Sequence, residues 1–249
     1  MPRRTRAQDG ATSHGAAAVE RGLTSEERAW CQEAAPFTMM SPERLVANMD
    51  AVAHVVRRGI PGALVECGVW RGGSVLVMIR TLQSLGVTDR ELYLYDTFDG
   101  MTRPTEADTS SFTPPALATW QESESAGRKP WDFVFDQQVF NLDAVRALLE
   151  ATGYPLDRIH FVVGPVEQTL PAEAISPIAL LRLDTDWYES TAHELAHLYP
   201  NLAPGGVLII DDYGHWDGAR RAVDEYFASA APPILLSRID YTGRIGIKG

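Results

Sequence analysis

The chain has 249 residues, which is enough for one large α/β domain and too few for two comfortable ones. Its formal net charge of −11 repels phosphate backbones, so a nucleic-acid partner is not expected. The two cysteines imply no disulfide framework. No apolar run approaches the ~20 residues that span a bilayer. The basic residues at the start are not followed by the apolar stretch that a secretory signal requires. We therefore expect a cytoplasmic protein without a membrane segment.

The first part of the chain carries few structural signals. Residues 1–25 are rich in alanine, glycine, serine, threonine and charge and show no apolar period, so residues 1–35 are expected to form a flexible N-terminal segment. A helix is predicted from Ser41, which can cap it and is followed by a proline at the first helical position, to Gly59. Residues 36–249 are expected to form one domain.

Strands and helices then alternate along the chain. Short apolar runs predict the strands, and apolar residues at helical spacing predict the helices between them. This order predicts a mostly parallel, doubly wound α/β sheet with an antiparallel C-terminal hairpin strand, and a ligand site beyond the carboxyl ends of the strands. The expected strands are 63–67, 91–95, 160–163, 178–183, 207–210, 234–239 and 244–248, and the expected helices are 73–85, 140–151, 190–198 and 217–228.

A glycine-rich turn, ECGVWRGGS, follows the first predicted strand. Gly68 and Gly72 let the backbone turn tightly beside a ligand, but their spacing does not match the dinucleotide fingerprint. Glu66 at the strand end suits the ammonium group of S-adenosylmethionine, and Ser74 is a further candidate contact. Arg71 could bind the methionine carboxylate or pair with a surface acid. A tight turn that binds nothing is the alternative interpretation of the whole segment.

The next two strand ends supply candidate contacts to a nucleoside. Asp96 can accept hydrogen bonds from both ribose hydroxyls, and Thr97 and Phe98 follow it directly. Gly164 and Val166, after the third strand, could pack against the adenine. The alternatives are a capping or turn aspartate and a Gly-Pro turn, neither of which needs a ligand.

Two pairs of carboxylates follow the fourth and fifth predicted strands. Asp184 and Asp186 come after one strand, and Asp211 and Asp212 come after the other. Neighbouring strands would bring these four side chains together, where their like charges repel unless a cation intervenes. We assign Asp184, Asp211 and Asp212 to Mg²⁺ or Mn²⁺, with Asp184 also beside the cofactor. The alternative is that they are solvated loop residues or helix caps.

Such a cluster has a chemical purpose. Coordination to a divalent metal lowers the pKa of a hydroxyl group, and a nearby carboxylate can then remove its proton. Asp186 is the candidate base. The resulting oxygen would attack the sulfonium methyl group of S-adenosylmethionine. His215 is an alternative base, although a histidine on a surface loop is the preferred interpretation of it.

Several of these motifs together resemble the macrocin O-methyltransferase family. The matching segments are VECGVWRGG at 65–73, YDTFDG at 95–100, LRLDTD at 181–186, and LAPGG at 202–206 running into IDDY at 210–213. A weaker match is Thr38, Met39 and Met40 followed by Arg44 and Leu45. The resemblance covers roughly residues 36–249.

The resemblance implies a class I methyltransferase fold of Rossmann-like topology, S-adenosylmethionine, Mg²⁺ and a sugar hydroxyl on an antibiotic as acceptor. It implies the same metal ligands and the same base, Asp186, and it also sets Thr38, Met39 and Met40 against the cofactor. Family members are often dimers or tetramers, so a homo-oligomer is expected. Residues 102–137 are long and rich in proline and serine, and they are a candidate lid over the acceptor.

Three alternatives stay open at this stage. A metal-dependent enzyme acting on a catechol or phenol would use the same metal chemistry. An oxidoreductase that binds NAD or a nucleotide sugar is a second alternative, and the missing dinucleotide fingerprint counts against it. A binding protein that retains the fold without catalysis is the third.

Overall fold

The computed structural model describes residues 22–171, 175, 177–229 and 231–249. Its centre is a seven-stranded sheet in the order β3-β2-β1-β4-β5-β7-β6. The first five strands of this order are parallel, and β7 pairs antiparallel with both β5 and β6. This topology confirms the predicted fold class. The strands are β1 (Ala63–Cys67), β2 (Leu92–Asp96), β3 (Ile159–Val163), β4 (Ile178–Leu183), β5 (Leu202–Ile210), β6 (Ser237–Arg238) and β7 (Arg244–Ile247).

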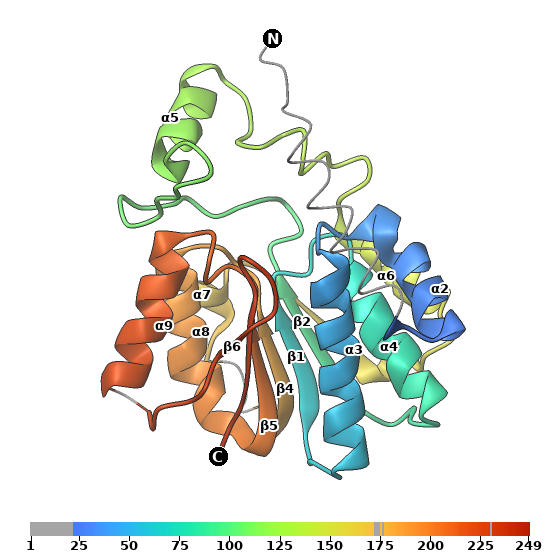
Figure 1. Cartoon of the computed structure of the whole chain (residues 1–249). Helices are drawn as coiled ribbons and strands as arrows, with labels where there is room; N and C mark the ends of the chain where they lie inside the picture. Colours follow the sequence, from blue (N-terminus) through green and yellow to red (C-terminus); the bar gives the residue numbers. More distant parts are fainter. Residues whose placement is uncertain (1–21, 172–174, 176, 230) are drawn as a thin grey trace.

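Helices cover both faces of the sheet (Figure 1). One layer holds α2 (Ser25–Ala34), α3 (Pro42–Arg57), α4 (Gly73–Ser84) and α6 (Leu142–Glu150), and the other holds α7 (Val166–Thr169), α8 (Tyr188–Leu198) and α9 (Asp217–Ser229). The remaining helix, α5 (Ala116–Ser125), stands beyond the carboxyl ends of the strands. No helix within the described ranges combines the length and apolarity that crossing a bilayer requires.

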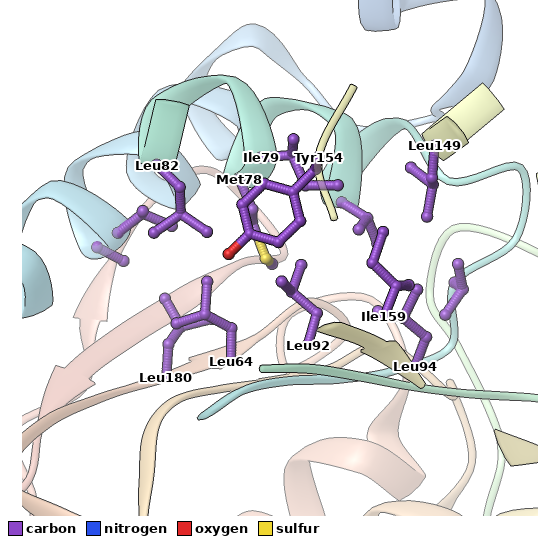
Figure 2. Close-up of a cluster of buried hydrophobic side chains, with 14 of the residues drawn as sticks. Leu64, Met78, Ile79, Leu82, Leu92, Leu94, Leu149, Tyr154, Ile159 and Leu180 are labelled. Atoms are coloured by element: carbon purple, nitrogen blue, oxygen red, sulfur yellow. The ribbon is translucent and has the colours of Figure 1, made fainter. Parts of the chain in front are cut away.

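Each strand contributes side chains to two separate cores. Leu64 of β1 and Leu92 of β2 pack beneath Met78 of α4 (Figure 2). The next residue on β1, Val65, points to the opposite face and packs in a second cluster with Leu195 of α8. Because both faces are covered, the strands are continuously apolar, and polar side chains are confined mainly to the strand ends. The ligand site is therefore expected at those ends.

The structure differs from the predicted elements in several places. Residues 25–34 form the helix α2, which was not predicted because few of its residues are apolar, although Thr24 and Glu27 form a capping box at its start. Strand β5 begins at Leu202 and not at residue 207. The strand predicted for 234–239 is reduced to the two residues of β6. The flexibility predicted for residues 1–21 concerns a segment that lies outside the described residues.

Candidate active site

A cavity of about 490 Å³ lies at the carboxyl ends of the strands. This volume is within the range of small-molecule sites. Among the predicted site residues, those that line the cavity are Thr38, Met39, Met40, Gly68, Ser74, Asp96, Thr97, Gly164, Val166, Asp184, Asp186, Asp211 and Asp212. Four others do not line it, namely Glu66, Arg71, Gly72 and Phe98.

The glycine turn is shaped by close backbone contacts. Gly68 has a φ of 82°, and a Cβ atom there would lie 1.9 Å from the carbonyl oxygen of Asp184. Only glycine therefore lets the end of β1 lie against the residue that follows β4. A Cβ atom on Gly73 would lie 2.6 Å from the carbonyl oxygen of Phe37, so this glycine lets the loop carrying Thr38 reach the turn.

Asp96 fixes the same turn from the end of β2. Its Oδ2 accepts hydrogen bonds from the backbone N–H groups of Val69 at 2.7 Å and Trp70 at 2.9 Å, and its Oδ1 accepts one from Phe98 at 2.7 Å. Burial raises the pKa of Asp96, and these hydrogen bonds oppose that shift. Both lone pairs of Oδ2 are therefore engaged, and Oδ1 keeps a lone pair for a ligand hydroxyl. The side chain of Phe98 turns into the core next to Phe161.

Glu66 does not line the cavity, and its contact with the cofactor stays a prediction. It is 1% exposed, and its Oε1 accepts hydrogen bonds from Ser74 Oγ and Arg182 Nη1, both at 2.5 Å. The parallel register sets Glu66 of β1 directly beside Arg182 of β4. The charge of Glu66 is therefore paired inside the protein, whereas its Oε2 has no hydrogen-bond partner among the described residues. The prediction missed this pairing because strand register cannot be read from either segment alone.

Arg71 forms no ion pair with an acid among the described residues, and its contact with the methionine carboxylate stays a prediction. Its guanidinium carbon lies 5.5 Å from the ring centre of Phe37 and 5.6 Å from that of Trp70, both cation–π distances. Gly72 has a φ of 87° and caps α4, where a Cβ atom would meet Val145 at 3.1 Å. Both residues shape the turn from outside the cavity.

The predicted carboxylate cluster is present at the ends of β4 and β5. Asp184, Asp211 and Asp212 each offer an oxygen atom, and these atoms all lie within 4.8 Å of one another. Asp212 is 9% exposed, and its Oδ2 has no hydrogen-bond partner within the described part of the chain. An unpaired buried carboxylate oxygen is costly, and a cation would satisfy it. An all-oxygen donor set of this kind fits a hard divalent ion.

The electrostatics of the cluster also fit a cation. Burial, followed by repulsion from Asp186 and Asp184, raises the pKa of Asp212 well above its ordinary value. Burial raises the pKa of Asp184 in the same direction, opposed by Arg182. The pKa of Asp186 is raised to about 6, again with burial as the largest cause. A divalent charge at this position would favour the ionised forms of all three.

Asp186 is held on the cavity wall by its surroundings. Its backbone is left-handed, with a φ of 68°, a conformation that aspartate tolerates better than most residues. Trp216 Nε1 donates a hydrogen bond to Asp186 Oδ1 at 2.8 Å. The preceding residue is anchored as well, because Thr185 Oγ1 donates to the buried Glu194 at 2.9 Å. The carboxylate is thus fixed at a position from which it can accept a proton.

Two arginines were not predicted as site residues. Arg182 is completely buried and contacts Glu66, Asp184 at 2.8 Å and Asp211 at 2.5 Å. Arg44, from the first turn of α3, lines the cavity and forms an ion pair with Asp211. An arginine within an otherwise apolar strand was the available signal for Arg182. Arg44 was visible only as a weak part of the family resemblance.

The segment 102–137 is anchored by aromatic packing to the residue that follows Asp186. The ring of Trp131 lies 5.8 Å from that of Trp187, which in turn lies 5.0 Å from Trp216. The buried Asp108 accepts a hydrogen bond at 2.8 Å from the backbone N–H of Tyr188, at the start of α8. The segment therefore contacts the loops that carry the carboxylates, and its role as a lid stays a prediction.

His215 lies on a turn, is half-buried and lines the cavity, which the interpretation as a surface-loop residue did not include. Its Nδ1 lies 3.0 Å from the hydroxyl of Tyr241, and its ring stacks on Phe112 at 5.5 Å. Burial, and then the charge of Arg44, lower the pKa of His215. The ring joins three loops at the mouth of the cavity.

Comparison with known proteins agrees with this geometry. The macrocin-O-methyltransferase (TylF) family model matches residues 2–245, a range that includes every residue lining the cavity. The chain is 36% identical over 206 residues to the 8-demethyl-8-(2,3-dimethoxy-alpha-L-rhamnosyl)-tetracenomycin-C 4'-O-methyltransferase of Streptomyces olivaceus. This match covers 83% of this chain and 73% of that protein. It is 32% identical over 233 residues to the demethyldecarbamoylnovobiocin O-methyltransferase of Streptomyces niveus, covering 93% and 82% of the two chains.

Among solved structures, the O-methyltransferase NovP superposes with a TM-score of 0.71 at 30% sequence identity. The match covers 85% of this chain and 82% of NovP. It confirms the class I methyltransferase fold that the resemblance implied.

Proposed function

Because the chain belongs to the macrocin-O-methyltransferase (TylF) family, we propose that it transfers the methyl group of S-adenosylmethionine to a sugar hydroxyl of a glycosylated small molecule. Catalysis of O-methylation follows from the family. The class of acceptor is suggested by the relatives, one of which is named for methylating a rhamnosylated tetracenomycin and another for methylating a demethylated novobiocin precursor.

One observation carries the proposal. A single cavity is lined both by the glycine turn with Asp96 and by the carboxylates of Asp184, Asp211 and Asp212. The first group suits a nucleoside, and the second suits a divalent cation. A methyl donor and an activated hydroxyl are therefore expected to meet within one site.

The charge of the cavity suits a cationic methyl donor. Its wall carries six carboxylates, on Asp96, Glu167, Asp184, Asp186, Asp211 and Asp212. Arg44 is the sole lysine or arginine among the described residues that line it. A sulfonium ion is favoured in such surroundings, whereas the pyrophosphate of NAD is not. We propose that the loop 38–40 and Ser74 hold the methionine part, Asp96 the ribose, and Gly164 with Val166 the adenine.

The residues of the chain then perform the transfer. Asp184, Asp211 and Asp212 would hold a divalent ion, whose positive charge would lower the pKa of a sugar hydroxyl beside it. Asp186, oriented by the indole N–H of Trp216, accepts the hydroxyl proton. The methyl C–S bond of S-adenosylmethionine breaks as the sugar oxygen forms the new C–O bond, which leaves S-adenosylhomocysteine. The cavity holds both reactants in line, which supplies much of the rate.

The acceptor is tested with a panel of small molecules. We expect S-adenosylhomocysteine to form when the protein is given S-adenosylmethionine, Mg²⁺ and a rhamnosyl or other deoxysugar glycoside, with product detected by mass spectrometry. The matching aglycone is the control. Turnover of a catechol but of no glycoside would instead favour the metal-dependent phenol O-methyltransferase.

We also propose a homo-oligomer, a dimer or a tetramer. The proposal rests on the resemblance to a family whose members are often dimers or tetramers. Light scattering of the purified full chain measures the mass directly, and a monomer at micromolar concentration would contradict the proposal.

A further inference from the structure

Arg44 poses a question that the transfer reaction leaves unanswered. It lines a cavity whose wall carries six carboxylates, and it sits in the first turn of α3 next to the loop that carries Met39 and Met40. A permanent guanidinium at this position lowers the attraction of the site for any other cation. The contacts of Arg44 suggest why it is there.

The guanidinium of Arg44 is shared between two carboxylates. Its Nη1 donates to Asp211 Oδ2, and its Nε forms an ion pair with Asp240 Oδ2 at 3.1 Å that lacks hydrogen-bond geometry. Its Nη2 donates to the carbonyl oxygen of Met39 at 3.3 Å. Asp211 belongs to the candidate metal ligands, whereas Asp240 lies on the turn between β6 and β7 and does not.

Asp211 is held by a second guanidinium from the opposite side. Arg182 Nη2 donates to Asp211 Oδ1 at 2.5 Å, so each oxygen of this carboxylate is engaged by one arginine. Arg182 is completely buried and does not line the cavity, whereas Arg44 does. A cation that enters from the cavity therefore competes with Arg44 for Asp211, and Arg182 stays in place behind it.

Asp240 is a prepared alternative partner for Arg44. Its Oδ1 accepts hydrogen bonds from the backbone N–H groups of Thr242 at 2.9 Å and Gly243 at 2.7 Å, and its Oδ2 accepts one from Ser41 Oγ at 2.8 Å. These bonds fix the carboxylate whether or not Arg44 also holds Asp211. The guanidinium can thus leave one acid without losing all of its charge pairing.

We propose that Arg44 is a resident counter-ion of the metal site, which releases Asp211 when a divalent ion binds and is then retained by Asp240 and the Met39 carbonyl. The proposal rests on the divalent ion of the proposed function. In the absence of the ion, Arg44 balances Asp211 and keeps the carboxylates together. The affinity for the metal ion then depends on how readily the ion replaces the guanidinium of Arg44 at Asp211. It therefore also depends on Asp240, although Asp240 is not a metal ligand.

The exchange predicts opposite effects for two substitutions. Arg44→Met removes the competitor and one positive charge, so Mn²⁺ should bind at least about tenfold more tightly. Asp240→Asn removes the alternative partner and leaves Arg44 more firmly on Asp211, so Mn²⁺ should bind several-fold more weakly. Arg80→Met is the matched control, because Arg80 pairs with Glu33 between α4 and α2, away from the cavity.

The test is the dissociation constant for Mn²⁺ of the full chain, measured by electron paramagnetic resonance of the free ion. Tighter binding by Arg44→Met and weaker binding by Asp240→Asn, with Arg80→Met unchanged, is the expected result. Unchanged or weaker binding by Arg44→Met overturns the exchange, as does an equal gain in Arg80→Met. If Arg44→Met fails to fold, unchanged or tighter binding by Asp240→Asn overturns it alone. If neither the wild type nor Arg44→Met binds Mn²⁺, the metal site of the proposed function is itself contradicted.

Discussion

Trp216 donates its indole N–H to Asp186 Oδ1 at 2.8 Å, which links the start of α9 to the loop after β4. Asp186 has a left-handed backbone, and the indole fixes the direction of its carboxylate. Trp216→Phe keeps the ring and removes the donor. We expect kcat for methyl transfer to fall by about tenfold, because a misaligned base loses part of its catalytic effect. Mn²⁺ affinity should stay unchanged.

Trp187→Phe is the control for this substitution. Its indole N–H donates to the carbonyl oxygen of Thr102 at 2.9 Å, and the ring packs against Trp216. The control therefore perturbs the same aromatic cluster and keeps the hydrogen bond from Trp216 to Asp186. Equal losses in both variants would show that packing, and not the hydrogen bond to Asp186, matters.

Asp186→Asn should abolish most of the chemistry and spare binding. The amide has nearly the shape of the carboxylate but cannot accept the hydroxyl proton, so kcat should fall by about 10²–10⁴-fold. Calorimetry should give an S-adenosylhomocysteine affinity within a few-fold of that of the wild type. A variant that keeps its activity would shift the role of base to another group, with His215 the next candidate on the cavity wall.

The sequence predicted the meeting of Asp184 with Asp211 because the order of strands in a parallel sheet follows from the alternation of elements. Both residues follow directly on apolar runs, and neighbouring strands end at one edge. The pairing of Glu66 with Arg182 was missed for a different reason. Its partner Arg182 lies on another strand, and the register that joins them is a property of the packed sheet.

Other features of the fold and the site could be recognised only from contacts in the folded structure. Phe98 follows the ribose acid directly, yet its side chain packs in the core. Helix α2 shows too weak an apolar period to be predicted and is held partly by the ion pair between Glu33 and Arg80. The link between Trp216 and Asp186 joins residues that are 30 positions apart. No local pattern encodes such a contact.

Gly68→Ala should destabilise the protein strongly. The new Cβ would lie 1.9 Å from the carbonyl oxygen of Asp184, and the φ of 82° disfavours any side chain. We expect a loss of about 2–5 kcal/mol in the free energy of unfolding by urea. Gly86→Ala is the control, since its φ is 72° but no atom lies within 4 Å of the new Cβ. It should cost only about 1–2 kcal/mol, and equal losses would mean that the contact with Asp184 adds nothing.

Arg182→Met should remove a buried charge on which three carboxylates depend. Glu66, Asp184 and Asp211 would lose their shared partner, and breaking a buried ion pair costs about 3–5 kcal/mol. Urea denaturation measures this loss. Adding Glu66→Gln to the variant removes one of the stranded charges and should restore part of it. A double variant no more stable than the single one would argue that Glu66 is not the principal partner.

The central claim is that a divalent ion at the ends of β4 and β5 makes a sugar hydroxyl reactive. The most direct measurement is the initial rate of S-adenosylhomocysteine formation with a glycoside acceptor, first in excess EDTA and then during titration with Mg²⁺. We predict that chelation lowers the rate by at least about 10²-fold and that Mg²⁺ restores it. A rate that EDTA leaves unchanged would contradict the claim.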